Sequence, residues 1–371
     1  ESQKEGMEPL LDMILQEIPD PSVDETGTFQ FQPALLDYND YVGRIGIGKI
    51  TKGMVSVGDN VNVIRVDGSI KQFKIQKLLG FMGLKRIEVE NAYAGDIVGI
   101  AGLEDIYVGE TVTKGQLEER LPLIEISEPT VQMNFGTNTS PFSGLEGSLV
   151  TARKIEDYLF KETERDVSLR VERLGTKEEW IVSGRGELHL SILIENMRRL
   201  GYEFHVSRPR VIEKVIDEKV YEPYEELQVD CPTEYIGSVI ELLGSKHAEL
   251  LQMTSYENQT RLNYVIPSRG LISFMTDFMT TTHGYGILSH NFLDYRPKEQ
   301  IGFIGRKLGA LVSSHTGPAT SYACGQIEER GELLIEPGTN VYEGMIVGIC
   351  NREEDLAVNI TREKQQTNQR S

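Results

Sequence analysis

Hydrophobic residues in the middle of the chain repeat with the spacing of an amphipathic helix. They recur at intervals of three, four and seven positions, which places them on one face of a helix with 3.6 residues per turn: Leu190, Leu193, Ile194, Met197 and Leu200. A β-rich run precedes them, and Gly184-Arg185-Gly186 separates the two. Glycines permit a positive φ and a sharp reversal, and Glu187 in the first helical turn suits the helix dipole. The pattern predicts a strand, a tight turn that displays Arg185, and a helix with a buried face.

The first part of the chain has a different pattern, in which short β-rich runs alternate with glycine. The runs are Arg44 to Ile50, Met54 to Val57, Asn60 to Val66, Ile70 to Ile75, and Ile97 to Ala101. Asp67-Gly68 between two of them is a strong hairpin signal. Many short strands without a helical period predict a small β-barrel, which we assign to residues 25–119.

Two α+β units are expected next, because the same order of elements occurs twice. The strand, helix, strand, strand, helix, strand order of a ferredoxin-like unit fits residues 129–134, 148–161, 167–172, 179–183, 187–200 and 203–215. It fits again at residues 226–231, 233–243, 249–254, 260–266, 271–282 and 286–295. We assign the two units to residues 120–217 and 218–299.

The two ends of the chain are less regular. Met7 to Ile18 predicts a helix ended by Pro19-Asp20-Pro21, so residues 1–24 are expected to form a helix and a linker. Residues 300–371 predict a mostly β unit, with strands at 301–312, 321–326, 333–335 and 345–349. Thr361 to Ser371 is almost free of apolar residues and is not expected to order alone. The fold class is therefore a multidomain α+β protein.

The composition of the chain argues against some classes of function. With 57 acidic against 38 basic side chains, the formal charge of −19 argues against nonspecific coating of nucleic acid but permits local basic sites. The three cysteines are far apart and have no neighbouring histidines, so neither a disulfide framework nor a zinc site is expected. We expect reduced thiols and a soluble, cytoplasmic protein without a membrane segment.

One segment resembles a phosphate-binding loop but fails the test for it. Gly43 to Lys49 satisfies the first seven positions, but Ile50 stands where Ser or Thr must hold Mg²⁺. The alternation through Ile45 and Ile47 instead predicts a strand. No HExxH or G-x-S-x-G pattern occurs either. We therefore expect no catalytic, metal-binding or cofactor-binding residue in this chain, and no enzyme activity of its own.

Several basic side chains lie at or beside predicted glycine turns: Arg185, Lys246, His247, Arg269 and His283. Dispersed basic turns on rigid domains can contact RNA phosphates and 2′-hydroxyls while the other faces remain acidic. The simpler alternative is that each turn is only a tight connection and each cation a solvated surface group.

The sequence resembles the translational GTPases, and among them the TypA/BipA family. Tyr41 to Ile50, with Gly53 and Val57-Gly58-Asp59, resembles the β-barrel that follows the G domain in these factors. Gly184 to Met197 resembles the third domain of elongation factor G. Its fifth domain resembles the following segments of this chain: Tyr221 to Pro232, Tyr235, Gly237, Pro267 to Gly270, and His283-Gly284.

The spacing of these segments separates the candidate families. Elongation factor G has a long fourth domain between the two modules, whereas here Arg208 to Val211 runs almost directly into Tyr221. LepA also lacks that domain. However, Val182 to Glu195, Gly305 to Ser313 and Val341 to Met345 resemble TypA/BipA rather than LepA.

The resemblance implies the ribosome-binding part of a GTPase that lacks its G domain, where GTP and Mg²⁺ would bind. It implies roles in large-subunit assembly and stress-related translation, and a cytoplasmic monomer that contacts rRNA, ribosomal proteins and the acceptor end of A-site tRNA. Candidate RNA contacts are added in the C-terminal unit: Arg306, Lys307, Arg362, Lys364, Asn368 and Arg370. Ser245 to Ala248 departs from the family pattern of a basic pair and glycine, which weakens the contact assigned there. The alternatives are a LepA-like or other ribosomal factor, a stand-alone metabolic enzyme, and a protein scaffold.

Overall fold

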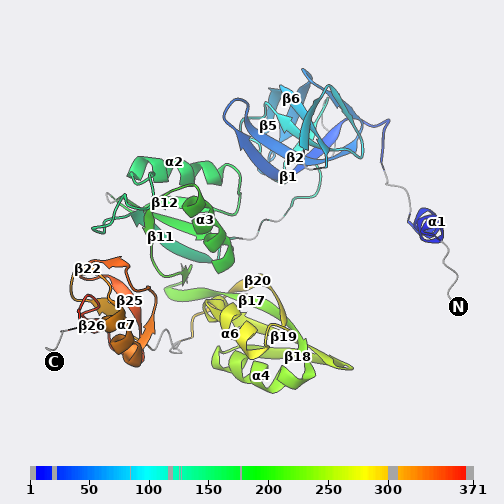
Figure 1. Ribbon diagram of the computed structural model, residues 1–371. Coiled ribbons are helices and arrows are strands. Elements are labelled where there is room, and N and C mark those ends of the chain that lie inside the picture. Colours follow the sequence, from blue (N-terminus) through cyan, green and yellow to red (C-terminus); the bar gives the residue numbers. More distant parts are fainter. Residues whose placement is uncertain are drawn as a thin grey trace, which may run out of the picture.

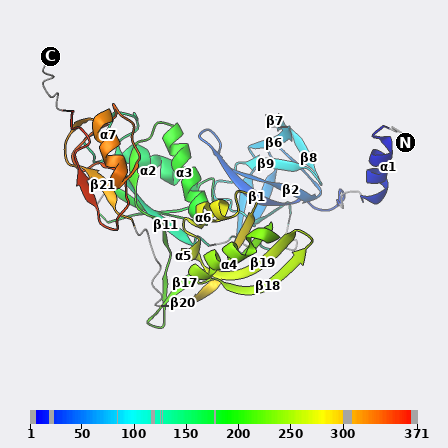
Figure 2. The same ribbon diagram turned by 60° about the horizontal axis from the view of Figure 1, so that its bottom comes forward.

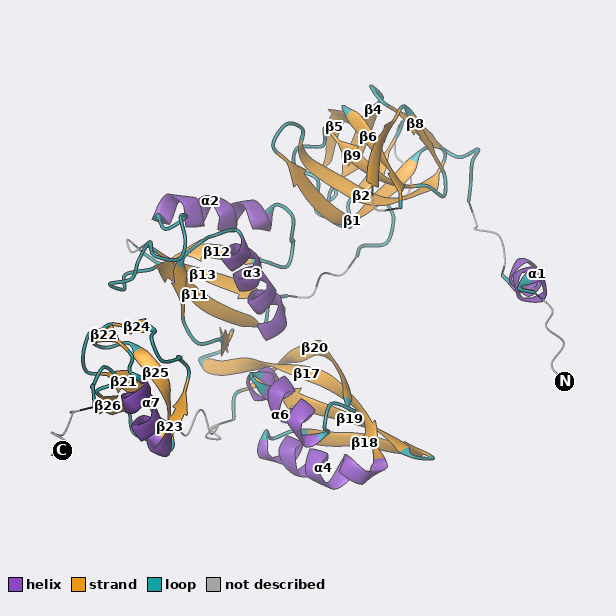
Figure 3. Ribbon diagram, viewed as in Figure 1, coloured by secondary structure: helices purple, strands orange, loops and turns teal. Residues whose placement is uncertain are grey.

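The computed structural model describes residues 6–18, 23–83, 85–115, 120–124, 126, 128–175, 178–299 and 308–364. Buried apolar side chains within these ranges gather in four separate clusters, one for each successive group of strands along the chain. Figures 1 and 3 show these groups as distinct units. The chain is thus a multidomain α+β protein rather than one continuous core.

Helix α1 (Glu8–Glu17) precedes the first sheet and has no buried residue. The strands of the first unit are β1 (Gln30–Asn39), β2 (Gly43–Lys52), β3 (Met54–Ser56), β4 (Asn60–Ile64), β5 (Ile70–Lys74), β6 (Lys77–Met82), β7 (Lys85–Val89), β8 (Asn91–Tyr93), β9 (Ile97–Ala101) and β10 (Thr111–Thr113). Eight of them form an antiparallel sheet in the order β5-β4-β10-β1-β2-β9-β6-β7, and β3 pairs with β8.

The predicted β-barrel is not closed by strand pairing. The sheet has two ends, β5 and β7, and in the described residues these strands do not pair with each other. Both are mostly exposed and carry lysine or arginine side chains, so they suit solvated edges better than a buried seam. The sheet still encloses a core that includes Phe31, Ile50 and Ile100, all 0% exposed.

Two local predictions in this unit are confirmed. The segment that resembles a phosphate-binding loop is strand β2, paired with β1 on one side and β9 on the other. Asp67-Gly68 forms the turn between β4 and β5, with Gly68 at φ +82° and the Asp67 carboxylate accepting the Ser69 N–H at 2.8 Å.

The second unit comprises β11 (Val131–Thr137), α2 (Ala152–Thr163), β12 (Arg170–Arg173), β13 (Glu179–Gly184), α3 (Glu187–Arg199), β14 (Phe204–Val206) and β15 (Arg210–Val211). Its sheet has the order β12-β13-β11-β14, with β15 also on β11, which is the strand order of a ferredoxin-like fold. The predicted strand 203–215 is interrupted, because Pro209 has no N–H to donate to a ladder. Leu200 follows the last helical residue and is 58% exposed, so it is not part of the buried stripe.

The third unit repeats this architecture. It comprises β16 (Lys214–Ile216), β17 (Lys219–Pro232), η1 (Thr233–Tyr235), α4 (Ile236–Ser245), β18 (Glu249–Tyr256), β19 (Gln259–Pro267), α5 (Ser268–Leu271), α6 (Phe274–Thr281) and β20 (Ile287–Pro297). β17 pairs with β19 and β20, and β18 lies at the edge beside β19. Helices α4 and α6 pack on one face of this sheet, where Val239, Leu243 and Phe278 are 0% exposed (Figure 3).

The fourth unit comprises β21 (Ala310–Ser313), β22 (Gly317–Pro318), α7 (Ser321–Ile327), η2 (Glu328–Arg330), β23 (Gly331–Leu333), β24 (Asn340–Val341), β25 (Ile346–Cys350) and β26 (Leu356–Val358). The strand predicted at 321–326 is wrong, since this segment is helix α7. The Thr320 side chain caps it by accepting the Ala323 N–H. Figures 1 and 2 both show this unit beside the second one, and the rings of Phe142 and Tyr342 meet edge to face at 4.9 Å.

Candidate functional site

The turn between β13 and α3 displays Arg185, as the sequence predicts. Its side chain is exposed, and its backbone carbonyl accepts a hydrogen bond from Thr130 Oγ1 at 2.7 Å. The reason for the two glycines differs from the expectation. Gly186 has an extended φ of 179°, and Gly184 is not among the residues with positive φ. A Cβ atom at Gly184 would lie 2.8 Å from His189 Nδ1, so this glycine permits close packing of the first helical turn.

His189 connects this turn to a distant carboxylate. Its Nδ1 accepts the Arg185 backbone N–H at 3.2 Å, and its Nε2 donates to Asp166 Oδ2 at 2.7 Å. This pairing fixes the proton on Nε2. Burial opposes ionisation of Asp166, but hydrogen bonds from His189 and Ser168 hold its pKa well below the ordinary value. Sequence reasoning missed this pair, because 23 residues separate its members.

The Arg185 turn borders a cleft of about 530 Å³ between the second and third units. Arg185, Leu188 and His189 line one side, and residues of α5 and α6 line the other. Glu187 Oε2 bridges the cleft by accepting the Ser273 backbone N–H at 2.7 Å. Ser273 adopts a left-handed conformation with φ 61°, so the bridge coincides with a strained residue.

An ion pair between a buried carboxylate and a partly exposed histidine lies in the same cleft and makes a pH dependence testable. The carboxylate of Glu225, which is 4% exposed, contacts His290 Nδ1 and raises the pKa of the imidazole, against the opposing effect of burial. A raised pKa in the folded state stabilises that state below the unfolded value and ceases to do so as pH rises through the folded value.

Stability of the third unit should therefore decline as pH rises, starting near the ordinary histidine pKa of about 6.5. Urea unfolding at a series of pH values should show this decline in the wild type and not in His290→Gln. His205→Gln, which changes an exposed ring on the Thr137 carbonyl, is the control. An unchanged slope in His290→Gln would refute the role of the pair.

The basic turns of the third unit lie at opposite ends of its helical layer. Lys246 follows α4 and reaches Asp277 of α6 at 3.6 Å, and His247 beside it has a positive φ of 57°. His283 follows α6 and packs its ring on Tyr235 at the start of α4, with centroids 5.5 Å apart. The helices therefore run antiparallel, and the structure does not bring His283 together with Lys246. Lys246 contacts α6 directly, whereas Arg185 lines the cleft that the first residues of α6 also line.

Arg269 has internal partners instead of an open position. Its Nε lies 2.9 Å from a carboxylate oxygen of Glu222, and its Nη2 donates to the Glu299 carbonyl at 3.1 Å. The Arg269 side chain is 14% exposed and that of Glu222 is 0% exposed. Burial raises the pKa of Glu222, and the nearby Arg269 opposes that rise.

The C-terminal candidates are only partly within the described residues. Arg362 and Lys364 are exposed, and the Arg362 carbonyl accepts a hydrogen bond from Thr320 Oγ1 at 2.5 Å. The remaining four candidates lie outside the described residues: Arg306, Lys307, Asn368 and Arg370.

Four family models match successive parts of the chain. The model of elongation factor Tu domain 2 matches residues 43–113, and that of elongation factor G domain III matches residues 148–208. The model of the elongation factor G C-terminus matches residues 219–301, and that of the TypA/BipA C-terminal domain matches residues 308–371.

Curated relatives match along the whole chain. A protein of Bacillus subtilis strain 168, named large ribosomal subunit assembly factor BipA, is 52% identical over 100% of this chain and 60% of its own length. Proteins with the same name from Synechocystis and from Escherichia coli K12 are 48% and 46% identical over 99% and 100% of this chain. The chain belongs to the TypA/BipA family of translational GTPases. It spans 62% of the Synechocystis relative and 61% of the E. coli relative.

The match at residues 308–371 distinguishes this TypA/BipA chain from the LepA-like alternative. A solved structure supports the fold alone. A crystal structure of a Thermus thermophilus protein superposes with a TM-score of 0.51 at 18% identity, covering 80% of this chain and 59% of that one.

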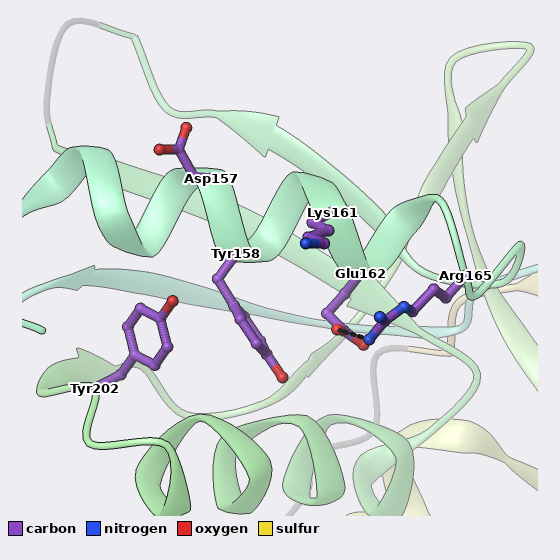
Figure 4. A pocket seen from close by; sticks show the side chains of 6 residues that line it. All are labelled: Asp157, Tyr158, Lys161, Glu162, Arg165 and Tyr202. Carbon is purple, nitrogen blue, oxygen red and sulfur yellow. Dashed lines mark hydrogen bonds and ion pairs between the residues drawn. The ribbon is translucent and has the colours of Figure 1, made fainter. Parts of the chain in front are cut away.

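A second hollow of about 330 Å³ lies on the second unit of this TypA/BipA chain (Figure 4). Tyr158 of α2 and Tyr202 line it with ring centroids 5.0 Å apart, and burial raises the pKa of Tyr158 to about 12. Lys161 of α2 and Arg165, just beyond the end of this helix, reach the first unit, with Lys161 2.6 Å from Asp40. The hollow therefore adjoins a contact between two units.

Other chemistry is limited within the described ranges. No group of three or more histidine, cysteine, aspartate or glutamate side chains there could hold a metal ion. The three cysteines are free and buried, and burial raises the pKa of Cys231 and Cys324. Within those ranges, every helix is too short or too polar to cross a membrane.

Proposed function

We propose that this chain is the ribosome-binding part of a TypA/BipA factor that acts in large-subunit assembly and in translation under stress. The observation that carries the proposal is identity of 46% to 52% along the whole chain with proteins named large ribosomal subunit assembly factors. A factor that acts on ribosomal particles works in the cytoplasm, and we propose that it binds them as a monomer.

We propose that rRNA and ribosomal proteins are the main docking partners. The exposed Arg185 supports an RNA contact at the edge of the cleft. Lys246, His247 and His283 would add contacts from the two ends of the α4/α6 layer. Arg269 would contribute only by exchanging its internal partner for RNA, since Glu222 and the Glu299 carbonyl hold it in the free chain.

The C-terminal unit would reach the acceptor end of an A-site tRNA. Arg362 and Lys364 are exposed at the end of the described chain and would begin that contact. Arg306, Lys307, Asn368 and Arg370 remain candidate contacts of the same unit.

GTP hydrolysis would belong to the whole factor. Mg²⁺ and nucleotide would be held by a G domain, since the loop-like segment of this chain is strand β2 within a sheet. We propose that ribosomal particles stimulate that hydrolysis and that GTP favours binding.

This function can be tested by cosedimentation of the full-length factor with ribosomal particles in the presence of a nonhydrolysable GTP analogue. Binding through several phosphates should weaken steeply between about 50 and about 200 mM salt. Arg185→Ala should weaken binding and reduce the salt slope by about one unit, because one phosphate contact is lost.

Arg153→Ala is the matched control. This arginine on α2 has a side chain 92% exposed, and among the described residues it pairs with Asp157 at 3.9 Å. Equal effects of the two variants would mean that Arg185 contributes to binding only through the net charge of the protein. Absence of association even at the lowest salt would exclude ribosome binding.

A further inference from the structure

The direction in which Arg185 points depends on the peptide that carries it. In the described part of the chain, two side chains hold the Arg185 backbone by hydrogen bonds, one on each side of its Cα: Thr130 donates to its carbonyl, and His189 accepts its N–H. The residue lies between Gly184, which pairs with Val131 in the sheet, and Gly186, which directly precedes α3. The orientation of the arginine is therefore set from outside the turn.

His189 can accept that N–H only in one protonation state. Its Nδ1 must be unprotonated, and the Nε2 contact to Asp166 at 2.7 Å selects this tautomer. Asp166 is itself fixed by the N–H and the hydroxyl of Ser168 at 2.9 and 2.6 Å. The carboxylate thus orients the ring, and the ring orients the Arg185 peptide.

The residues on either side of Asp166 anchor this arrangement on the first unit. Glu164 pairs with Arg44, and the Arg165 guanidinium lies 3.4 Å from the Tyr38 carbonyl oxygen. Val167 packs against the core of the first unit. Three residues of the segment from Glu164 to Val167 therefore contact the first unit, and the fourth, Asp166, contacts His189.

We propose that His189, oriented by Asp166, is the positioning residue that sets Arg185 for contact with RNA. The RNA part of this inference rests on the function proposed above; the positioning part does not. A purely structural role would only stabilise the start of α3, and any residue that preserves the helix would satisfy it.

Two substitutions separate these roles, because each places an amide group at the position of only one of the two ring nitrogens. In His189→Asn the amide oxygen can replace Nδ1 as acceptor of the Arg185 N–H. In His189→Gln the longer amide reaches the position of Nε2 and keeps only the Asp166 contact. Ser191→Ala is the control, since Ser191 donates to the Glu187 carbonyl at 2.9 Å in the same helical turn.

Hydrogen exchange of the Arg185 amide, measured by NMR on the ribosome-free chain, tests the positioning directly. Protection should persist in His189→Asn and in Ser191→Ala and fall at least about tenfold in His189→Gln, since an unpaired exposed amide exchanges readily. Equal protection in His189→Asn and His189→Gln would overturn the assignment of His189 as the positioning residue.

A double-mutant cycle tests the consequence for RNA. His189→Gln should weaken binding of the full-length factor to ribosomal particles about five- to tenfold, as loss of one ordinary hydrogen bond would. The same change in an Arg185→Ala background should have almost no effect. Additive losses would show that His189 does not act through Arg185. If the wild type does not bind, the proposed function fails, while the exchange result still decides the positioning.

Discussion

Replacing Gly48 by alanine is expected to destabilise the eight-stranded sheet by about 3 kcal/mol or more. A Cβ atom at this position would lie 2.0 Å from the Gln32 carbonyl oxygen and 3.0 Å from Pro33 Cα. Both are backbone atoms of β1, the strand that pairs with β2, so neither can turn aside. Native-state hydrogen exchange, read by mass spectrometry on peptides from β1 and β2, gives the local free energy of opening.

Gly46→Ala is the matched control on the same strand. Its Cβ would meet Pro33 Cβ at 3.3 Å and Ile106 Cδ1 at 3.4 Å, which are side-chain atoms that can move by a few tenths of an ångström. We expect a cost below about 1 kcal/mol. Equal costs at the two glycines would refute the close approach of β1 as the reason for Gly48. The comparison also shows why a glycine pattern typical of a phosphate-binding loop occurs in a strand.

Periodicity was a reliable guide where one element buries one face. The stripe through Leu190, Leu193 and Met197 is buried in α3, and the two ferredoxin-like orders appear as predicted. Helix α7 was misassigned as a strand because it has only seven residues, too few for a helical period to stand out. Thr320 was the available signal, since threonine is a favoured N-cap and its side chain accepts the Ala323 N–H.

Features that depend on several segments were harder to predict. Closure of a barrel requires the first and last strands to pair, and short runs such as β5 and β7 carry no information about that pairing. The break near Pro209 could have been predicted from the missing N–H of proline. The packing role of Gly184 could not, because it depends on where the His189 ring lies.

The candidate site likewise has local features that the sequence predicts and nonlocal features that it does not. The exposure of Arg185 follows from a local turn and was predicted from the sequence. Its supports come from far along the chain: Asp166 contacts His189 across 23 residues, and Glu187 contacts Ser273 across 86. The internal partner of Arg269 is equally nonlocal, since Glu222 belongs to the start of β17. Sequence spacing identifies candidate basic side chains. It does not identify the distant carboxylates that orient these side chains or pair with them.

The second large expected effect on stability concerns the contact between the first two units. The two partners of one ion pair there should differ in how much their removal costs. Arg44 donates from Nε to Glu164 Oε2 and from Nη1 to the Ile106 carbonyl, each at 3.0 Å. The Arg44 side chain is 8% exposed, whereas that of Glu164 is 41% exposed. Removing Glu164 leaves a buried guanidinium without its counter-charge, while removing Arg44 leaves a carboxylate that water can reach.

Glu164→Ala should therefore cost about 2 kcal/mol, below the range for fully buried pairs because water screens the carboxylate. Arg44→Met should cost about half as much, since methionine fills the space of the arginine stem without burying a charge. Lys161→Ala is the control, because its pair with Asp40 is exposed and should contribute less than about 1 kcal/mol. Hydrogen exchange of β2 and α2 measures all three variants. A larger cost for Arg44→Met than for Glu164→Ala would mean that the Ile106 carbonyl and the Tyr107 ring, whose centroid lies 4.7 Å from the guanidinium, hold this cation without Glu164.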